Sequence, residues 1–235
     1  MTPRHMMKIS IASVLAAASA QALAGEAAAP PDTSEWKCSA CPFDKGYEAD
    51  VTAGAIYASG ANAASGRYTG IDHEAGYLDV GAHGTYANEK GQFATYSLDG
   101  LGLASRSGSI KFGQYGHYDI ALKYDGQPFN RFDRTQTPFT SGTDQALPSD
   151  WIAAGSTAGM DGLAAALHDV GIGTLRKTYG LNARWMAGHG VTLFGSYERQ
   201  DKTGTQIAGA TFLAQAMQLA VPVHYQTDTF EVGAQ

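Results

Sequence analysis

The stretch HYDIALKY, residues 117–124, decides the fold, because its side chains alternate between apolar and polar or small. One set consists of Tyr118, Ile120, Leu122 and Tyr124, and the other of His117, Asp119, Ala121 and Lys123. A period of two residues places alternate side chains on opposite faces of a β-strand. The stretch therefore predicts a strand with one apolar and one polar face.

The same alternation continues in both directions along the chain. It is clear in residues 77–87, 175–187 and 191–198, where Lys177 and Phe194 break the pattern. Weaker segments at 49–58, 92–98, 105–112 and 227–234 bring the total to about eight strands, or about four hairpins. The connectors 88–91, 114–116 and 188–190 are short and contain Gly, as hairpin turns do, whereas 59–75 and 127–173 are long. We therefore expect an all-β, antiparallel fold with a long loop at 127–173.

Alternating strands occur both in soluble β-sandwiches and in transmembrane β-barrels. Two features favour the barrel. Short turns at one rim and long loops at the other are typical of outer-membrane barrels. In addition, Tyr118 and Tyr124 lie six residues apart on one face, as do Tyr179 and Trp185. That spacing suits aromatic girdles at the two membrane interfaces.

The N-terminus predicts export from the bacterial cytoplasm. Arg4 and Lys8 precede an apolar stretch at 9–20, which ends in the small-residue site at 22–24. This stretch has only about a dozen residues, whereas a membrane-spanning helix needs roughly 20. We interpret residues 1–24 as a cleaved signal peptide, 25–46 as a periplasmic lead rich in Ala and Pro, and 47–235 as the strand region.

The lead contains both cysteines of the protein, Cys38 and Cys41. In an oxidising compartment, such a pair is either a small disulfide loop or a redox-active dithiol. It is not a c-type haem motif, because Pro42 and not His follows Cys41. It is not a complete structural zinc site either, because such a site needs four ligands. We expect no metal site and no cofactor of the protein's own.

Composition narrows the function further. The 235 residues carry a net charge of −6, and only 16% are charged, against roughly 25% in a typical soluble domain. Nucleic acid is therefore not an expected partner. The sequence shows no nucleophile elbow, phosphate-binding Gly loop or catalytic His-Glu helix, so we predict no catalytic residues and no enzyme activity.

Several of these features follow one another in a recognisable order. It runs through the signal peptide, Cys38-x-x-Cys41, Pro42, Gly46-Tyr47, the alternating strands, Tyr124-x-x-x-Pro128 and residues 131–139. From about residue 36 to 235, the chain resembles the N-terminal part of the MtrB/PioB-type decahaem-associated outer-membrane proteins.

The resemblance implies an outer-membrane β-barrel that sheathes a periplasmic multihaem c-type cytochrome and positions it for electron transfer across the membrane. It implies a multihaem cytochrome on the outer surface as a further partner, and it places the haem in the partners. In a subset of this family a CxxC pair lies near the mature N-terminus, which implies a redox-sensitive or assembly-related role for Cys38 and Cys41. A passive disulfide stays an alternative.

A barrel of eight strands has an interior that side chains or one small ligand already fill. We therefore expect this chain to be the N-terminal portion, or fragment, of a larger barrel. Two other functions stay open, a passive porin-like channel and a soluble secreted β-sandwich.

Overall fold

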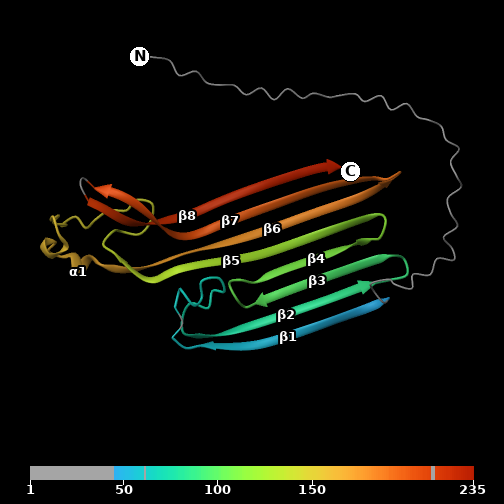
Figure 1. The fold of residues 1–235 in the computed structure, drawn as a ribbon, viewed down its shortest axis with the longest axis horizontal. Helices are drawn as coiled ribbons and strands as arrows, with labels where there is room; N and C mark the ends of the chain where they lie inside the picture. Colours follow the sequence, from blue (N-terminus) through green and yellow to red (C-terminus); the bar gives the residue numbers. More distant parts are fainter. Residues whose placement is uncertain (1–44, 61, 213–214) are drawn as a thin grey trace, which may run out of the picture. The chain divides into compact units, whose positions relative to one another are not determined.

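The computed structural model describes residues 45–60, 62–212 and 215–235. They form one antiparallel sheet of eight strands, which follow one another across the sheet in sequence order. The strands are β1 (Gly46–Ala58), β2 (Ala75–Ala87), β3 (Gln92–Leu101), β4 (Ser107–Gln114), β5 (Tyr118–Thr137), β6 (His168–Gly188), β7 (Val191–Phe212) and β8 (Gln215–Ala234) (Figure 1). The prediction of eight antiparallel strands is confirmed. The predicted signal peptide and the CxxC pair lie outside the described residues.

The predicted short and long connectors are found, but the lengths do not alternate throughout, because the connector 102–106 between β3 and β4 is also short. Residues 88–91, 115–117 and 189–190 make short turns at one rim of the sheet, called the turn rim below. The opposite rim, the loop rim, carries the long connectors 59–74 and 138–167 (Figure 1). The connector between β6 and β7 consists of His189 and Gly190, and both residues have positive φ, as a two-residue type I′ hairpin requires.

The long loop predicted at 127–173 is wrong in its bounds. β5 continues to Thr137 and β6 begins at His168, which leaves 138–167, with a 3-10 turn at Thr157–Gly159 and the short helix α1 (Leu163–Ala166). Pro128 lies inside β5 opposite Leu175, and the register shifts twice between Asn130 and Thr135. Each bulge adds a residue and breaks the period of two, so this part of the strand lacks the alternation that identified the rest.

The register aligns the apolar residues of neighbouring strands into rows. Ile110 lies opposite Leu122, Leu122 opposite Leu181, and Leu181 opposite Tyr197. Because directly opposed residues share a face of an antiparallel sheet, the apolar sets of all strands lie on one side. We call this side the apolar face; it includes Val51, Leu78, Val80, Tyr96, Ile110, Phe112, Ile120, Leu122, Leu181, Trp185, Leu193, Phe230 and Val232. The opposite side is the polar face.

Neither face carries a second layer within the part of the chain that the structure describes. On the apolar face Val51 is 71% exposed, Leu78 62% and Phe230 75%. A soluble β-sandwich buries one face of each sheet against the other, so this alternative is wrong for the described strands. No described helix is long and apolar enough to cross a membrane.

Candidate functional site: the two faces and the loop rim

An apolar band crosses the sheet between two aromatic rows. On β5 and β6 it begins near the turn rim with Tyr118 opposite Trp185, and six residues on Tyr124 lies opposite Tyr179. The rings of Tyr124 and Tyr179 lie 5.3 Å apart. The two six-residue spacings seen in the sequence therefore coincide across the sheet. An apolar band between aromatic rows is the lipid-facing surface of an outer-membrane barrel.

On β7 and β8 the same face becomes polar at the level of the second aromatic row, where Arg199 lies opposite Tyr179. Arg199 lies opposite Asp228 and its Nε lies 3.4 Å from an Asp201 carboxylate oxygen. Asp228 accepts hydrogen bonds from the Gln226 amide at 2.9 Å and the Tyr197 hydroxyl at 2.7 Å. The charged groups mark where the strands leave the apolar band.

The lengths of β5 to β8 agree with an apolar band that ends before the loop rim. β5, β6, β7 and β8 contain 20, 21, 22 and 20 residues. A tilted transmembrane strand needs only about 9–11 residues to cross the hydrocarbon core. The four strands therefore reach well past the band on the loop side and carry the sheet beyond the membrane.

An ion cluster on the polar face ties three strands together. Asp119 on β5 is only 7% exposed. Its carboxylate lies 2.9 Å from the Arg184 guanidinium on β6 and 3.5 Å from Lys111 Nζ on β4. A carboxylate this buried is costly unless cations and hydrogen bonds surround it. The cluster satisfies Asp119 and links β4, β5 and β6 in register.

The first three strands give the polar face a negative sector. Glu48, Asp50, Asp79 and Asp99, together called the acidic sector, lie on this face. Among the described residues, no Lys or Arg of β1, β2 or β3 shares that face with them. His83 lies on the same face, with its Nε2 3.4 Å from an Asp99 carboxylate oxygen. The wall therefore presents a localised negative charge opposite to its lipid side.

The connector 59–74 folds back onto β5 instead of extending away from the sheet. The Asn130 backbone N–H donates to the Arg67 carbonyl oxygen at 3.0 Å, and the Asn130 amide donates to Asp72 at 2.6 Å. The rings of Tyr68 and Phe129 lie 5.8 Å apart. β3 and β4 are short, so they end before β5 does, and this connector occupies the space beside the exposed edge of β5 (Figure 1).

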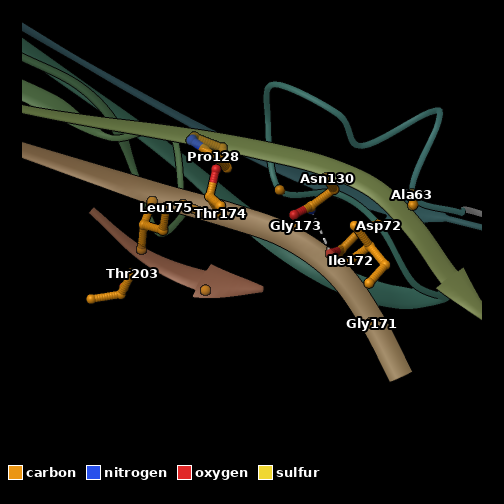
Figure 2. Close-up of a pocket in the computed structure, with 13 residues that line it drawn as sticks. Ala63, Asp72, Pro128, Asn130, Gly171, Ile172, Gly173, Thr174, Leu175 and Thr203 are labelled. Atoms are coloured by element: carbon orange, nitrogen blue, oxygen red, sulfur yellow. Dashed lines mark hydrogen bonds between the residues drawn. The ribbon is translucent and has the colours of Figure 1, made fainter. Parts of the chain in front are cut away.

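Beside this contact lies an open hollow of about 540 Å³, bordered by the connector, β5, β6 and β7. Figure 2 shows Asp72 and Asn130 turned towards each other beside Gly173, with Pro128 and Thr174 farther along the two strands. The lining is mostly small or apolar. The carboxylate of Asp72 is already bonded to Asn130, so we assign the hollow no chemistry.

Neither the ion cluster nor the contact between the connector and β5 is predictable from the sequence pattern. Asp119 and Arg184 are both recognisable as polar-face residues from alternation, but only the register shows that they are partners. For the connector no signal was available, because Asp72 and Asn130 lie 58 residues apart. The neighbours of Asp72 have other partners: His73 bonds Asp72 itself, and Glu74 accepts a hydrogen bond from Tyr57.

A two-faced antiparallel sheet with an aromatic-edged apolar band is the wall of an outer-membrane β-barrel. Comparison with known proteins agrees. Residues 57–235 match the family described as outer membrane beta-barrel porin, MtrB/PioB. Over 203 residues the chain is 30% identical to "Outer membrane protein MtrB" of Shewanella baltica (strain OS185). That alignment covers 85% of this chain and 29% of the relative.

The chain belongs to the MtrB/PioB family, and it is an outer-membrane protein. The family resemblance inferred from the order of motifs is confirmed, as are the barrel fold class and the location. The family is one of porin-like barrels and not a class of enzymes. The chain spans 29% of the length of the curated relative that it matches. The activity of the whole protein is therefore proposed below.

Proposed function

We propose that the barrel containing these strands sheathes a periplasmic multihaem c-type cytochrome and positions it for electron transfer across the outer membrane. The observation that carries the proposal is the uncovered polar face of the eight-stranded sheet, in a member of the MtrB/PioB family. A polar interior wall can dock the surface of a soluble-type protein while the apolar face satisfies lipid.

The size of the lumen depends on further strands. Among the described residues, β1 and β8 each pair with one strand only, so both outer edges of the sheet are open. Open edges are not tolerated in lipid, because their backbone groups would lack hydrogen bonds. Additional strands in the whole protein would close the barrel, and its diameter grows with the strand number. A lumen wide enough for a cytochrome follows from such closure.

The barrel and the cytochrome would have different roles. We expect no cofactor in the barrel itself; the cytochrome carries the haem, and the barrel supplies position and shielding. The acidic sector gives the lumen a negative wall, which would favour a basic surface on the docked protein. A multihaem cytochrome on the outer surface would be the second partner, reached at the loop rim.

Co-purification tests the sheath. The full-length protein is extracted from outer membranes in detergent and captured by an affinity tag, and its partners are stained for covalent haem. We expect a haem-containing protein with the wild type and several-fold less with Asp50→Lys/Asp99→Lys, because both substitutions reverse charge inside the lumen. The matched control is Asp201→Lys/Asp228→Lys, which makes the same charge change on the opposite face.

Unchanged retention by the lumenal variant, or equal loss in the control, would contradict the docking role of the acidic sector. Absence of any haem protein from the wild type would contradict the sheath itself. The family's description as a porin favours a second candidate, a passive channel for small solutes. Ion conductance in a planar bilayer, together with no cytochrome partner, would support it.

For Cys38 and Cys41 we propose a disulfide or redox pair in the periplasmic lead. Without reductant, an alkylating reagent should leave both thiols unmodified in the mature protein, and after reduction it should modify both. Modification without reductant would show free thiols and would contradict a stable disulfide.

A further inference from the structure

We infer that the apolar face holds a specific site for a phosphorylated lipid, on β3 to β6 near the loop rim. The site consists of an apolar groove for an acyl chain and two cations, Arg106 and Lys177, for the phosphate. It lies on the face opposite to the acidic sector, so it does not depend on the proposed sheath function.

The groove is open on one side and has a volume of about 680 Å³. Its apolar lining comes from Tyr96, Leu98, Ile110, Leu122, Tyr124 and Tyr179. Gly108 lies in the middle of this lining, opposite Leu98 on one side and Tyr124 on the other. Gly108 has no side chain, and the end of the Leu98 side chain lies over it, 2.9 Å from where a Cβ would stand. A flexible hydrocarbon chain fits such a hollow better than a flat surface does.

The two cations stand at the loop-rim end of the groove. Arg106 follows the β3–β4 turn, and its guanidinium carbon lies 5.8 Å from the centre of the Tyr124 ring. Lys177 lies two residues beyond Tyr179 on the same face of β6. Among the described residues, neither cation makes an ion pair. Asp201 is the cross-strand neighbour of Lys177, but its carboxylate pairs with Arg199.

The order of these groups matches the order of groups in a lipid. The apolar lining continues towards the middle of the band through Ile110 and Leu122, whereas the cations lie past Tyr124 and Tyr179, at the headgroup level. A cation at this level attracts an anionic headgroup, at about 1 kcal/mol for each Lys or Arg near the surface. Phosphate is the common anionic group of membrane lipids. The groove favours an acyl chain and the two cations favour a phosphate, so a phosphorylated lipid of the loop-side leaflet is the ligand that fits the site.

Native mass spectrometry of the full-length barrel in detergent tests the site. The probes are dioleoyl phosphatidic acid and dioleoylglycerol, which share their chains and differ in the phosphate. We expect the wild type to retain the phosphatidic acid better than the dioleoylglycerol, and Arg106→Gln/Lys177→Gln to lower retention of the phosphatidic acid by about thirtyfold. Retention of dioleoylglycerol should not change. Equal retention of phosphatidic acid by wild type and variant would overturn the site.

Two further variants separate the parts of the site. Arg176→Gln/Lys202→Gln removes two neighbouring cations from the polar face and should leave phosphatidic acid retention unchanged. Gly108→Val narrows the groove and should lower retention of both lipids. Its Cβ would lie 2.9 Å from the end of the Leu98 side chain, which can move aside, and 3.6 Å from the Ser97 carbonyl oxygen, which is an ordinary contact. Equal loss in the polar-face pair, or full retention by Gly108→Val, would overturn the proposal.

Inorganic phosphate alone distinguishes a lipid site from an anion site. At the concentration of the lipid probe it should not displace phosphatidic acid, because it lacks the chain that occupies the groove. Displacement would overturn the lipid assignment. Heat-modifiable gel migration checks that each variant is folded, and cytochrome co-purification should be retained in Arg106→Gln/Lys177→Gln.

Discussion

At the scale of single residues, neighbours in the chain have opposite surroundings. Leu122 is 46% exposed on the apolar face, between Ile110 and Leu181, whereas Ala121 points to the polar face, between Lys111 and Asn182. In water such exposure of Leu would be unfavourable, but in lipid it is favourable. The same substitution at the two positions should therefore have very different effects.

Leu122→Arg should impair membrane assembly, because a charge near the middle of the lipid face costs roughly 2–4 kcal/mol. Ala121→Arg places the same side chain in the polar interior and should assemble nearly as the wild type does. Folding yield into lipid vesicles, read from heat-modifiable gel migration, measures the difference. Equal yields for the two variants would mean that the faces are assigned incorrectly.

At Gly113, near the turn rim, β4 and β5 lie close together. A Cβ built there would lie well inside contact distance of the Tyr118 carbonyl oxygen, which belongs to the backbone and cannot move aside easily. Gly113→Ala should destabilise the sheet by about 1–3 kcal/mol, as overpacking does. Gly180→Ala, also on the polar face, would meet only Lys123 Cβ, at 3.5 Å, and should be tolerated. Urea unfolding in vesicles measures both, and similar midpoints would contradict the close approach.

The sequence predicts those properties of a residue that depend on its neighbours along the chain, and not those that depend on residues of other strands. The face of Leu122 or Asp119 follows from the alternation of its own strand, because the period of two is a local property. The partners of Asp119 depend instead on the pairing of β4, β5 and β6, which local pattern does not contain. Alternation therefore predicts which residues are polar-facing, while the ion cluster becomes visible only in the structure.

At the scale of elements, the connector 59–74 is a packed part of the wall. Its contact with β5 rests on the hydrogen bond between the side chains of Asn130 and Asp72 and on the bond from the Asn130 backbone N–H to Arg67. A backbone bond persists when a side chain is removed, so substitution of Asp72 isolates the side-chain contribution.

Asp72→Ala should loosen this connector. The substitution removes the hydrogen bond from Asn130 and also the contact of Asp72 with His73, which lies within the connector. The loss of the one bond to β5 corresponds to about 1 kcal/mol, or roughly a fivefold increase in the open population. Trypsin cleavage after Arg67 follows that population when opening is fast compared with cleavage, so it should accelerate by a similar factor. Asp161→Ala, in the other long connector, should leave the rate unchanged. A rate at Arg67 that does not respond to Asp72→Ala would show that the carboxylate does not hold the connector.

Element boundaries were predictable only where the alternation was regular. The predicted strand 77–87 agrees with β2 almost in full, but the predicted strand 175–187 lacks the first seven residues of β6, and β5 is predicted to end at Tyr124 and continues to Thr137. Pro128 and the two register shifts after Asn130 remove the pattern without ending the strand, because β6 still pairs with this arm. Strand extension here is decided by the neighbouring strand, which is a tertiary property.

At the scale of the whole molecule, the sheet separates two environments. Its apolar face meets lipid, and its polar face meets whatever the barrel encloses. The sequence predicted this separation and the family, because both depend on pattern and motif order. The location of charge within the lumen was not predicted, since it requires the strands to be placed side by side. The acidic sector arises because the acidic residues of β1, β2 and β3 fall together without a Lys or Arg among them.

This arrangement predicts the ion selectivity of the barrel when its lumen is empty. A wall lined with carboxylates raises the local concentration of cations. The full-length barrel, freed of any cytochrome and placed in a planar bilayer under a KCl gradient, should therefore favour K⁺ over Cl⁻. Asp50→Lys/Asp99→Lys should shift the reversal potential towards zero, whereas Asp201→Lys/Asp228→Lys, on the outer side of the sheet, should shift it much less. Equal shifts for the two variants would mean that the acidic sector does not line the lumen. Neither the sheath nor the channel would then have the negative interior wall described above.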